Sequence, residues 1–374
     1  MLYDWMRLFF QDSRSETARV FPEPVEEARW TERLKSFHPT EPGQILNGRF
    51  KTIAKLGYGR GSTVWLAENL ECRIWSKSKL PRYVSIKIAA LDIDASDEIG
   101  FLELIANANP SHEGLKYIRV PLDTFDLQDI KDDNILTSPM TDSDIKPFAN
   151  HCKASAQPRY IGKDGRVTYA SHDEIIGIRG SPWPRLADFN TCFPLLPDDF
   201  CSTAPIQSDV FRAPEVFLGI PWSYKVDIWN LGLMMWSLVQ GTDLFDGSVG
   251  DDGEYDAHVH LAQMITTLGR PPPLLVKRER LCRENKQSDL VSPKGKECET
   301  MNEYWGGPFF DDDGCMIRKD LVKEGKMVPQ LLTELTNEDK TQFLRLLDDM
   351  IKWLPERRKS AAELLKHPFF IHED

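Results

Sequence analysis

The stretch KVDIWNLGLMMWSLVQG (residues 225–241) constrains the fold of this 374-residue chain most strongly. As a helix it would carry apolar side chains on nearly all sides, and such a helix is stable only when it is buried. Residues 336–355 are amphipathic with helical spacing, and Ser360 and Glu363 have the spacing of a capping box. A large helical lobe is therefore predicted after Trp222.

The first half of the chain has strand-like patterns instead. Apolar and polar residues alternate in RFKTIAKLGYG and STVWLAENL, which a glycine-rich turn joins, and YVSIKIAAL has the composition of a third strand. ASDEIGFLELIANA has helical spacing, and LKYIRVPLDTFDL is strand-like again. The predicted fold class is α+β, with a small β-rich lobe over residues 46–126 and a larger α-helical lobe over residues 127–372.

Two segments are predicted to lie outside these lobes or to interrupt them. Residues 1–45 are rich in proline and charge, and we expect an extended or disordered arm. From about 137 to 183, proline, glycine, serine and charged residues dominate, which indicates an irregular insert in the second lobe.

Composition excludes several classes of protein. The 46 basic and 58 acidic residues give a net charge of -12, which argues against direct nucleic-acid binding and is compatible with basic partners. Seven cysteines, an odd number with no C-x-x-C pair, favour a reducing compartment over a disulfide framework. No apolar run approaches the roughly 18 residues of a membrane span. We expect a monomer that does not associate with membranes.

The glycine-rich turn Gly57-Tyr58-Gly59-Arg60-Gly61 lies between two predicted strands. Glycine lets the backbone approach a phosphate group, and the backbone N–H groups can then bind that phosphate. A plain hairpin turn is the alternative. The β-rich sequence after the turn disfavours a dinucleotide-binding motif, which needs a helix there, and the absence of G-K-[ST] disfavours a P-loop.

A lysine and a glutamate follow the turn in a suggestive order. Lys87 lies on the third predicted strand, and Glu98 lies on the helix after it. One interpretation is a solvated strand lysine. The other is a phosphate-binding lysine that Glu98 holds in place, with Glu103 as a rival for that role.

Two further motifs have the residue types that phosphoryl transfer needs. Asp129, Lys131 and Asn134 can share one loop face, with a carboxylate for the acceptor hydroxyl, a cation for the phosphate and an amide oxygen for a metal. Asp188, in Asp-Phe-Asn after an apolar strand, can bind the metal that bridges the phosphates. Each motif alone also fits an Asx-type turn.

The order of all the motifs decides between these interpretations. After them come Ala-Pro-Glu ending at Glu215, then D-x-W-x-x-G from Asp227 to Gly232, and then Arg358, a candidate partner for a buried Glu215. In this order the motifs resemble those of a eukaryotic protein kinase over residues 45–372. LGYGRGSTVWLA, DIKDDNIL, SDVFRAPEVFLG and PERRKSAAELLKHPFF resemble more narrowly the serine/arginine-protein kinases, especially their fungal relatives.

The resemblance implies a bilobal protein-kinase fold, ATP and Mg2+ as cofactors, and serine or threonine in Arg/Ser-rich proteins as phosphate acceptor, in the cytoplasm and nucleus. The acidic groups at 251–256 and 311–313 would suit such basic substrates. On this mapping Asp129 orients the acceptor, Lys131 stabilises the charge of the transferring phosphate, and Asn134 and Asp188 hold Mg2+.

The same mapping assigns the nucleotide side of the site. Lys87 and Glu98 would form the phosphate-positioning pair. The residues that would cover the nucleotide are Leu56, Gly57, Gly59 and Val64.

Three departures from the family pattern are visible. Asn190 replaces the glycine of D-F-G, and Leu127 stands where a loop histidine is expected. Glu98 and Asp129 are only 31 residues apart, whereas a hinge and two helices need roughly twice that separation. The missing helix would leave one face of the 225–241 helix bare.

Three hypotheses follow from these departures. The chain is an active serine/threonine kinase, a catalytically impaired kinase-like interaction protein, or a sequence from which an internal segment has been lost.

Overall fold

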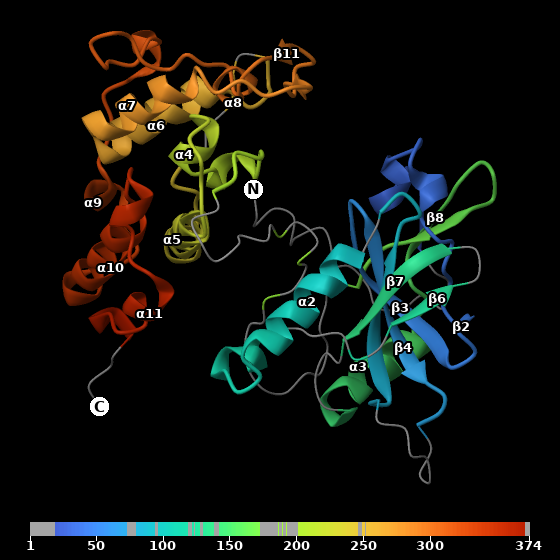
Figure 1. Cartoon of the computed structure of the whole chain (residues 1–374). Helices are drawn as coiled ribbons and strands as arrows, with labels where there is room; N and C mark the ends of the chain where they lie inside the picture. The colour runs from blue at the N-terminus through green and yellow to red at the C-terminus, as the bar shows by residue number, and fades with distance from the viewer. Residues whose placement is uncertain are drawn as a thin grey trace. The chain divides into compact units, whose positions relative to one another are not determined.

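The computed structural model describes residues 19–72, 80–93, 96–118, 122, 124–127, 130–137, 142–172, 186, 189, 192, 201–245, 249–250 and 252–370. The chain divides into two compact units, residues 1–193 and residues 194–374 (Figure 1). Each unit is described by itself. In the part of the chain with described structure, no helix is both long enough and apolar enough to cross a membrane.

The first unit is built on a six-stranded antiparallel sheet in the order β2-β3-β4-β5-β7-β6. The predicted strands on either side of the glycine-rich turn are its longest members, and they pair as a hairpin. The strands are β2 (Ile45–Leu46), β3 (Phe50–Gly59), β4 (Ser62–Asn69), β5 (Tyr83–Ala89), β6 (Thr124–Leu127) and β7 (Ile130–Thr137). The predicted β-rich region is therefore present.

Helices and a small sheet cover the two faces of this large sheet. Helix α3 (Asp142–Ala154) packs Phe148 and neighbouring apolar residues against Tyr83 of β5. Trp65 of β4 faces a second cluster that includes Tyr169 of the small sheet. That sheet consists of β1 (Val20–Phe21), β8 (Arg159–Ile161) and β9 (Val167–Tyr169). The remaining elements are α2 (Ser96–Ala108) and the 3-10 helices η1 (Glu26–Arg29), η2 (Leu34–Ser36) and η3 (Glu113–Tyr117).

The arm and the insert are more ordered than the sequence predicts. Residues 19–45 contain β1, η1 and η2, and they bury Ala28 and Phe37. Residues 142–172 of the insert form α3, β8 and β9. The two predictions are wrong for these residues, because each segment supplies what the other lacks: β1 pairs with β8, and neither would be stable as an isolated short strand. Residues 1–18 and 173–183 lie outside the described residues.

The boundary between the units also differs from the predicted one at residues 126/127. Strand β7 pairs with β5 and β6, and α3 packs on β3, so residues 130–172 belong to the first unit. The strand-like pattern predicted for residues 115–127 is also shorter in the structure, since residues 113–117 form η3.

The second unit is predominantly helical, and α5 (Lys225–Gln240) contributes Trp229 and Trp236 to its core. Gly241 ends α5 in a left-handed conformation, which glycine adopts without steric cost. The other helices are α4 (Pro214–Phe217), α6 (Ala257–Leu268), α7 (Pro273–Cys282), α8 (Met301–Tyr304), α9 (Val328–Leu331), α10 (Asn337–Met350) and α11 (Ala361–Leu364). The short strands are β10 (Leu290–Val291) and β11 (Glu297–Cys298), and the 3-10 helices are η4 (Asp209–Phe211), η5 (Lys319–Leu321), η6 (Pro355–Arg357) and η7 (Pro368–Phe370).

Gly232 explains how α5 and the end of α10 approach each other. A Cβ atom at this position would lie 3.1 Å from the Met350 Cβ and 3.0 Å from the Ile351 Cγ1. A larger residue would require Met350 and Ile351 to shift by a few tenths of an ångström, so the glycine of D-x-W-x-x-G favours this close packing.

One face of α5 remains exposed, as the missing helix led us to expect. Leu231, Met234 and Leu238 are 37%, 46% and 76% exposed. Their spacing of three and four residues places them on the same side of the helix.

Glu215 and Arg358 form a buried ion pair in the second unit, as the sequence predicts. The Arg358 guanidinium donates to both carboxylate oxygens, at 2.6 and 2.7 Å, and both side chains are fully buried. Arg358 also donates to the backbone carbonyl of Lys225. The pair therefore ties α4 to the start of α5 and to the segment after η6.

We predict that Arg358→Met strongly destabilises the protein, because it leaves the Glu215 carboxylate buried without its counter-charge. The expected loss in free energy of unfolding is about 3–5 kcal/mol, measured by urea denaturation. Arg357→Met is the matched control, since Arg357 is exposed, and it is expected to change stability by less than about 0.5 kcal/mol. Equal losses in the two variants would contradict this account of the pair.

Candidate active site

The glycine-rich turn is the tip of the β3–β4 hairpin, and all four predicted nucleotide-covering residues lie on this hairpin. Gly57 is paired with Val64, while Leu56 and Gly59 lie on either side of Gly57. A Cβ atom on Gly57 or Gly59 would meet nothing within 4 Å. The backbone is therefore open to a group that approaches from outside, as a phosphate-covering turn requires.

The sheet aligns the turn with the predicted phosphate-binding lysine. Gly57 of β3 is paired with Val64 of β4, Val64 is paired with Lys87 of β5, and Lys87 is paired with Ile135 of β7. Directly opposed residues on neighbouring strands share a face and lie about 5 Å apart. Three predicted site residues thus occupy one row across the sheet.

Lys87 is held by Glu98 and not by its rival. The Lys87 Nζ atom lies 2.7 Å from Glu98 Oε2, and the side chains are 20% and 4% exposed. Glu103 is on the exposed side of α2. A buried carboxylate thus orients the ammonium of a lysine whose side chain is still one-fifth exposed.

The Asp-Phe-Asn motif reaches the same glutamate. The Phe189 backbone N–H donates to Glu98 Oε1 at 3.3 Å, so Glu98 accepts one bond from the lysine and one from this motif. Just before the motif, Leu186 N donates to the Tyr117 carbonyl at 2.7 Å. Asp188 itself lies outside the described residues, as does Asn190.

The predicted catalytic loop has a different conformation in the structure. Residues 130–137, which include Lys131 and Asn134, form strand β7, with Asn134 paired with Phe125. Asp129 lies outside the described residues. The prediction of a loop is therefore wrong for this segment. Strand β7 pairs with the edge of β5, while β6 pairs with the other side of β7. An unpaired strand edge attracts any segment able to pair with it, which accounts for the extended conformation of residues 130–137.

The described residues include the groups that would bind the nucleotide phosphates, but they do not include both predicted Mg2+ ligands. An open glycine-rich backbone and an oriented lysine suit ATP phosphates. Of the two predicted Mg2+ ligands, Asn134 lies in β7 and Asp188 is not described, so the Mg2+ site stays a prediction.

Sequence reasoning missed three residues next to the turn: Arg33, Lys55 and Gln157. Lys55 lies on β3, Gln157 binds the backbone of Lys55, and Arg33 binds the backbone of Arg60 in the turn. No sequence signal singles them out, because Arg33 lies in a charged arm, Lys55 looks like a solvated strand residue, and Gln157 lies in a segment without periodicity.

Comparison with known proteins agrees with this geometry. Residues 112–370 match the protein kinase domain family, which is more than half of the chain. A serine/threonine protein kinase of Aspergillus fumigatus is 28% identical over 385 residues, covering 90% of this chain and 88% of the relative. The serine/threonine-protein kinase SRPK of Physarum polycephalum is 23% identical over 416 residues, covering 89% and 88%. Both aligned regions are longer than this chain, so these relatives contain residues that it lacks.

The fold has a kinase counterpart among solved structures. The crystal structure of a kinase domain superimposes with a TM-score of 0.59 at 18% identity, covering 90% of this chain and 99% of that one. The architecture is the protein-kinase fold, with a β-rich and a helical lobe. The chain belongs to the protein kinase domain family and is an ATP-dependent protein kinase with serine/threonine kinases among its relatives.

We predict that Glu98→Gln lowers kcat/KM for ATP by about tenfold or more, because an amide oxygen orients the Lys87 ammonium less strongly than a carboxylate does. Steady-state kinetics measure this change. Glu103→Gln removes an exposed charge from the same helix and is expected to stay within about twofold of the wild type. A similar loss in both variants would contradict the assignment of Glu98.

Proposed function

We propose that this chain transfers the γ-phosphate of ATP to serine or threonine hydroxyls in Arg/Ser-rich proteins, as a kinase of the serine/arginine-protein kinase type. The observation that supports it most is the convergence of Lys87 and the backbone of Phe189 on the two oxygens of Glu98. This contact joins β5, α2 and the Asp-Phe-Asn motif at one point, as a phosphoryl-transfer site requires.

In the proposed reaction the acceptor oxygen forms a bond to the γ-phosphorus while the bond from that phosphorus to the bridging oxygen of ADP breaks. Asp129 accepts the hydroxyl proton, and Lys131 stabilises the charge on the transferring group. Lys87 holds the phosphates in place, and the turn at Gly57 and Gly59 covers them. Mg2+, when bound by Asn134 and Asp188, would neutralise the charge on the phosphate oxygens.

The choice of a basic substrate has two supports. The chain has a net charge of -12, and its relatives include SRPK of Physarum polycephalum. SRSF protein kinase 3 of Mus musculus is 29% identical over 169 residues, although it shares only 45% of this chain and 26% of its own length. A role in the regulation of RNA splicing, in the cytoplasm and nucleus, belongs to the same proposal.

The acidic groups predicted to attract such substrates are partly engaged within the second unit. Asp252 pairs with Lys294 at 2.6 Å, and Asp256 caps α6 through the backbone of His258. Asp311 pairs with Lys319 at 2.9 Å. These contacts give the three carboxylates structural roles, so the substrate proposal rests on overall charge and relatives rather than on these groups.

One observation favours a second candidate, a kinase-like interaction protein with impaired catalysis. Strand β7 holds Lys131 and Asn134 in a sheet, whereas the reaction requires both to act from a loop.

A phosphate-transfer assay separates these candidates. We predict that the wild-type chain transfers labelled phosphate from MgATP to an Arg-Ser repeat peptide, and that Asp129→Ala and Asp188→Ala each lower the rate by at least about 100-fold. A peptide with lysine in place of arginine tests the substrate class separately. Equal incorporation by wild type and both variants would contradict the proposal and favour the second candidate.

A further inference from the structure

The arm contacts β3 and the glycine-rich turn at three successive positions. These positions are the root of the turn at Lys55, its middle at Tyr58 and its tip at Arg60. The insert reaches the root as well, through Gln157.

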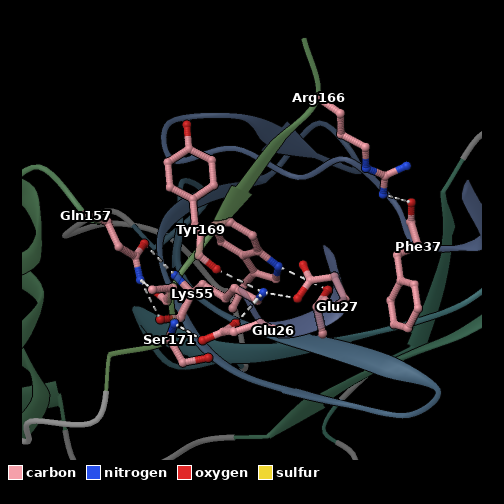
Figure 2. Close-up of polar contacts among 11 residues, drawn as sticks. Glu26, Glu27, Phe37, Lys55, Gln157, Arg166, Tyr169 and Ser171 are labelled. Carbon is pink, nitrogen blue, oxygen red and sulfur yellow. Dashed lines mark hydrogen bonds and ion pairs between the residues drawn. The ribbon is translucent and has the colours of Figure 1, made fainter. Parts of the chain in front are cut away.

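At the root, the Lys55 side chain is fully buried and two carboxylates of η1 neutralise it. Its ammonium donates a hydrogen bond to Glu27, and Glu26 Oε2 lies 2.7 Å away as an ion-pair contact without a hydrogen bond of its own. The ammonium also donates to the Tyr169 carbonyl at 3.0 Å. Figure 2 shows the Lys55 ammonium pointing between the two glutamates. Glu26 adopts a left-handed backbone conformation with φ of 51°, which residues with a side chain disfavour. The carboxylates of Glu26 and Glu27, neighbours in the sequence, both reach the Lys55 ammonium.

Gln157 of the insert binds the backbone of Lys55, in addition to the pairing of this residue with Trp65 of β4. Gln157 accepts from Lys55 N at 3.0 Å and donates to Lys55 O at 2.9 Å. The pairing of β3 with β4 is irregular on both sides of this residue, between Thr52 and Ala54 and between Lys55 and Gly57. A bulged strand lacks part of its ladder, so these external bonds fix the direction in which the strand enters the turn.

At the middle and the tip, the arm touches the turn itself. The Trp30 and Tyr58 rings lie 5.8 Å apart. Arg33 donates to the Arg60 carbonyl at 2.7 Å and binds Asp92, after the end of β5, at 2.8 Å. The hydrogen bond from Arg33 holds the pKa of the Asp92 carboxyl below its usual range.

We propose that residues 26–33 of the arm, together with the insert, hold the glycine-rich turn in position for the nucleotide, with Arg33 and Lys55 as positioning residues. This inference rests on the proposed function of the turn. A turn with open space around Gly57 and Gly59 samples many conformations when nothing restrains it. Restraint before binding lowers the entropy that ATP binding must overcome.

The test uses Arg33→Gln in the full chain, because loss of the buried Lys55 charge would endanger folding. Arg82→Gln is the matched control: Arg82 is also an arginine in an ion pair of the first unit, with Glu68 at 2.8 Å. Hydrogen exchange of the amides at residues 57–61 is measured without nucleotide, and KM and kcat for ATP are measured separately.

We expect exchange in Arg33→Gln to be about two- to tenfold faster than in Arg82→Gln, with KM for ATP raised by a similar factor and kcat unchanged. Equal exchange in the two variants would overturn the inference. A fall in kcat with unchanged KM would overturn it too, since that pattern indicates a role in the chemical step. If the wild type neither binds nor uses ATP, the proposed function fails, and the exchange measurement still decides whether the arm restrains the turn.

Discussion

The buried ammonium of Lys55 imposes a condition on the whole first unit. A fully buried charge must be neutralised and hydrogen-bonded where it lies. Glu26 and Glu27 come from the arm, and the carbonyl of Tyr169 comes from the insert, so three distant segments have to meet at β3. The arm and the insert are ordered for this reason, and the strand that enters the glycine-rich turn is restrained as a consequence.

The ion pair of Lys87 and Glu98 adds a candidate phosphate-binding group to this framework. Lys87 lies in one row with Gly57 and Val64, and Glu98 fixes its ammonium while also binding the backbone of Phe189. The fold thus places a cation in the same row of the sheet as the open glycine turn, two strands away, which suits a polyphosphate. The buried pair of Glu215 and Arg358 has the corresponding structural role in the second unit.

The sequence predicted those features that depend on local pattern or on motif order. The β3–β4 hairpin, the buried helix α5, the capping box at Ser360 and the contacts of Lys87 and Arg358 are of this kind. Features that depend on long-range partners were missed. Lys55 alternates like any solvated strand residue, and nothing in its neighbourhood shows that residues 28 and 114 positions away will bury it. The strand β7 was missed because the D-x-K-x-x-N spacing indicates a loop, whereas an open strand edge at β5 selects an extended segment.

The central claim is that the first unit brings together an ATP site around Lys87 and the glycine-rich turn. Isothermal titration calorimetry of the wild-type chain with ATP and Mg2+ tests it most directly, without requiring any substrate. The account predicts saturable binding of one ATP per chain, with a Kd between about 1 μM and 1 mM. Absence of saturable binding across this range, in a protein whose cooperative unfolding shows it to be folded, would contradict it.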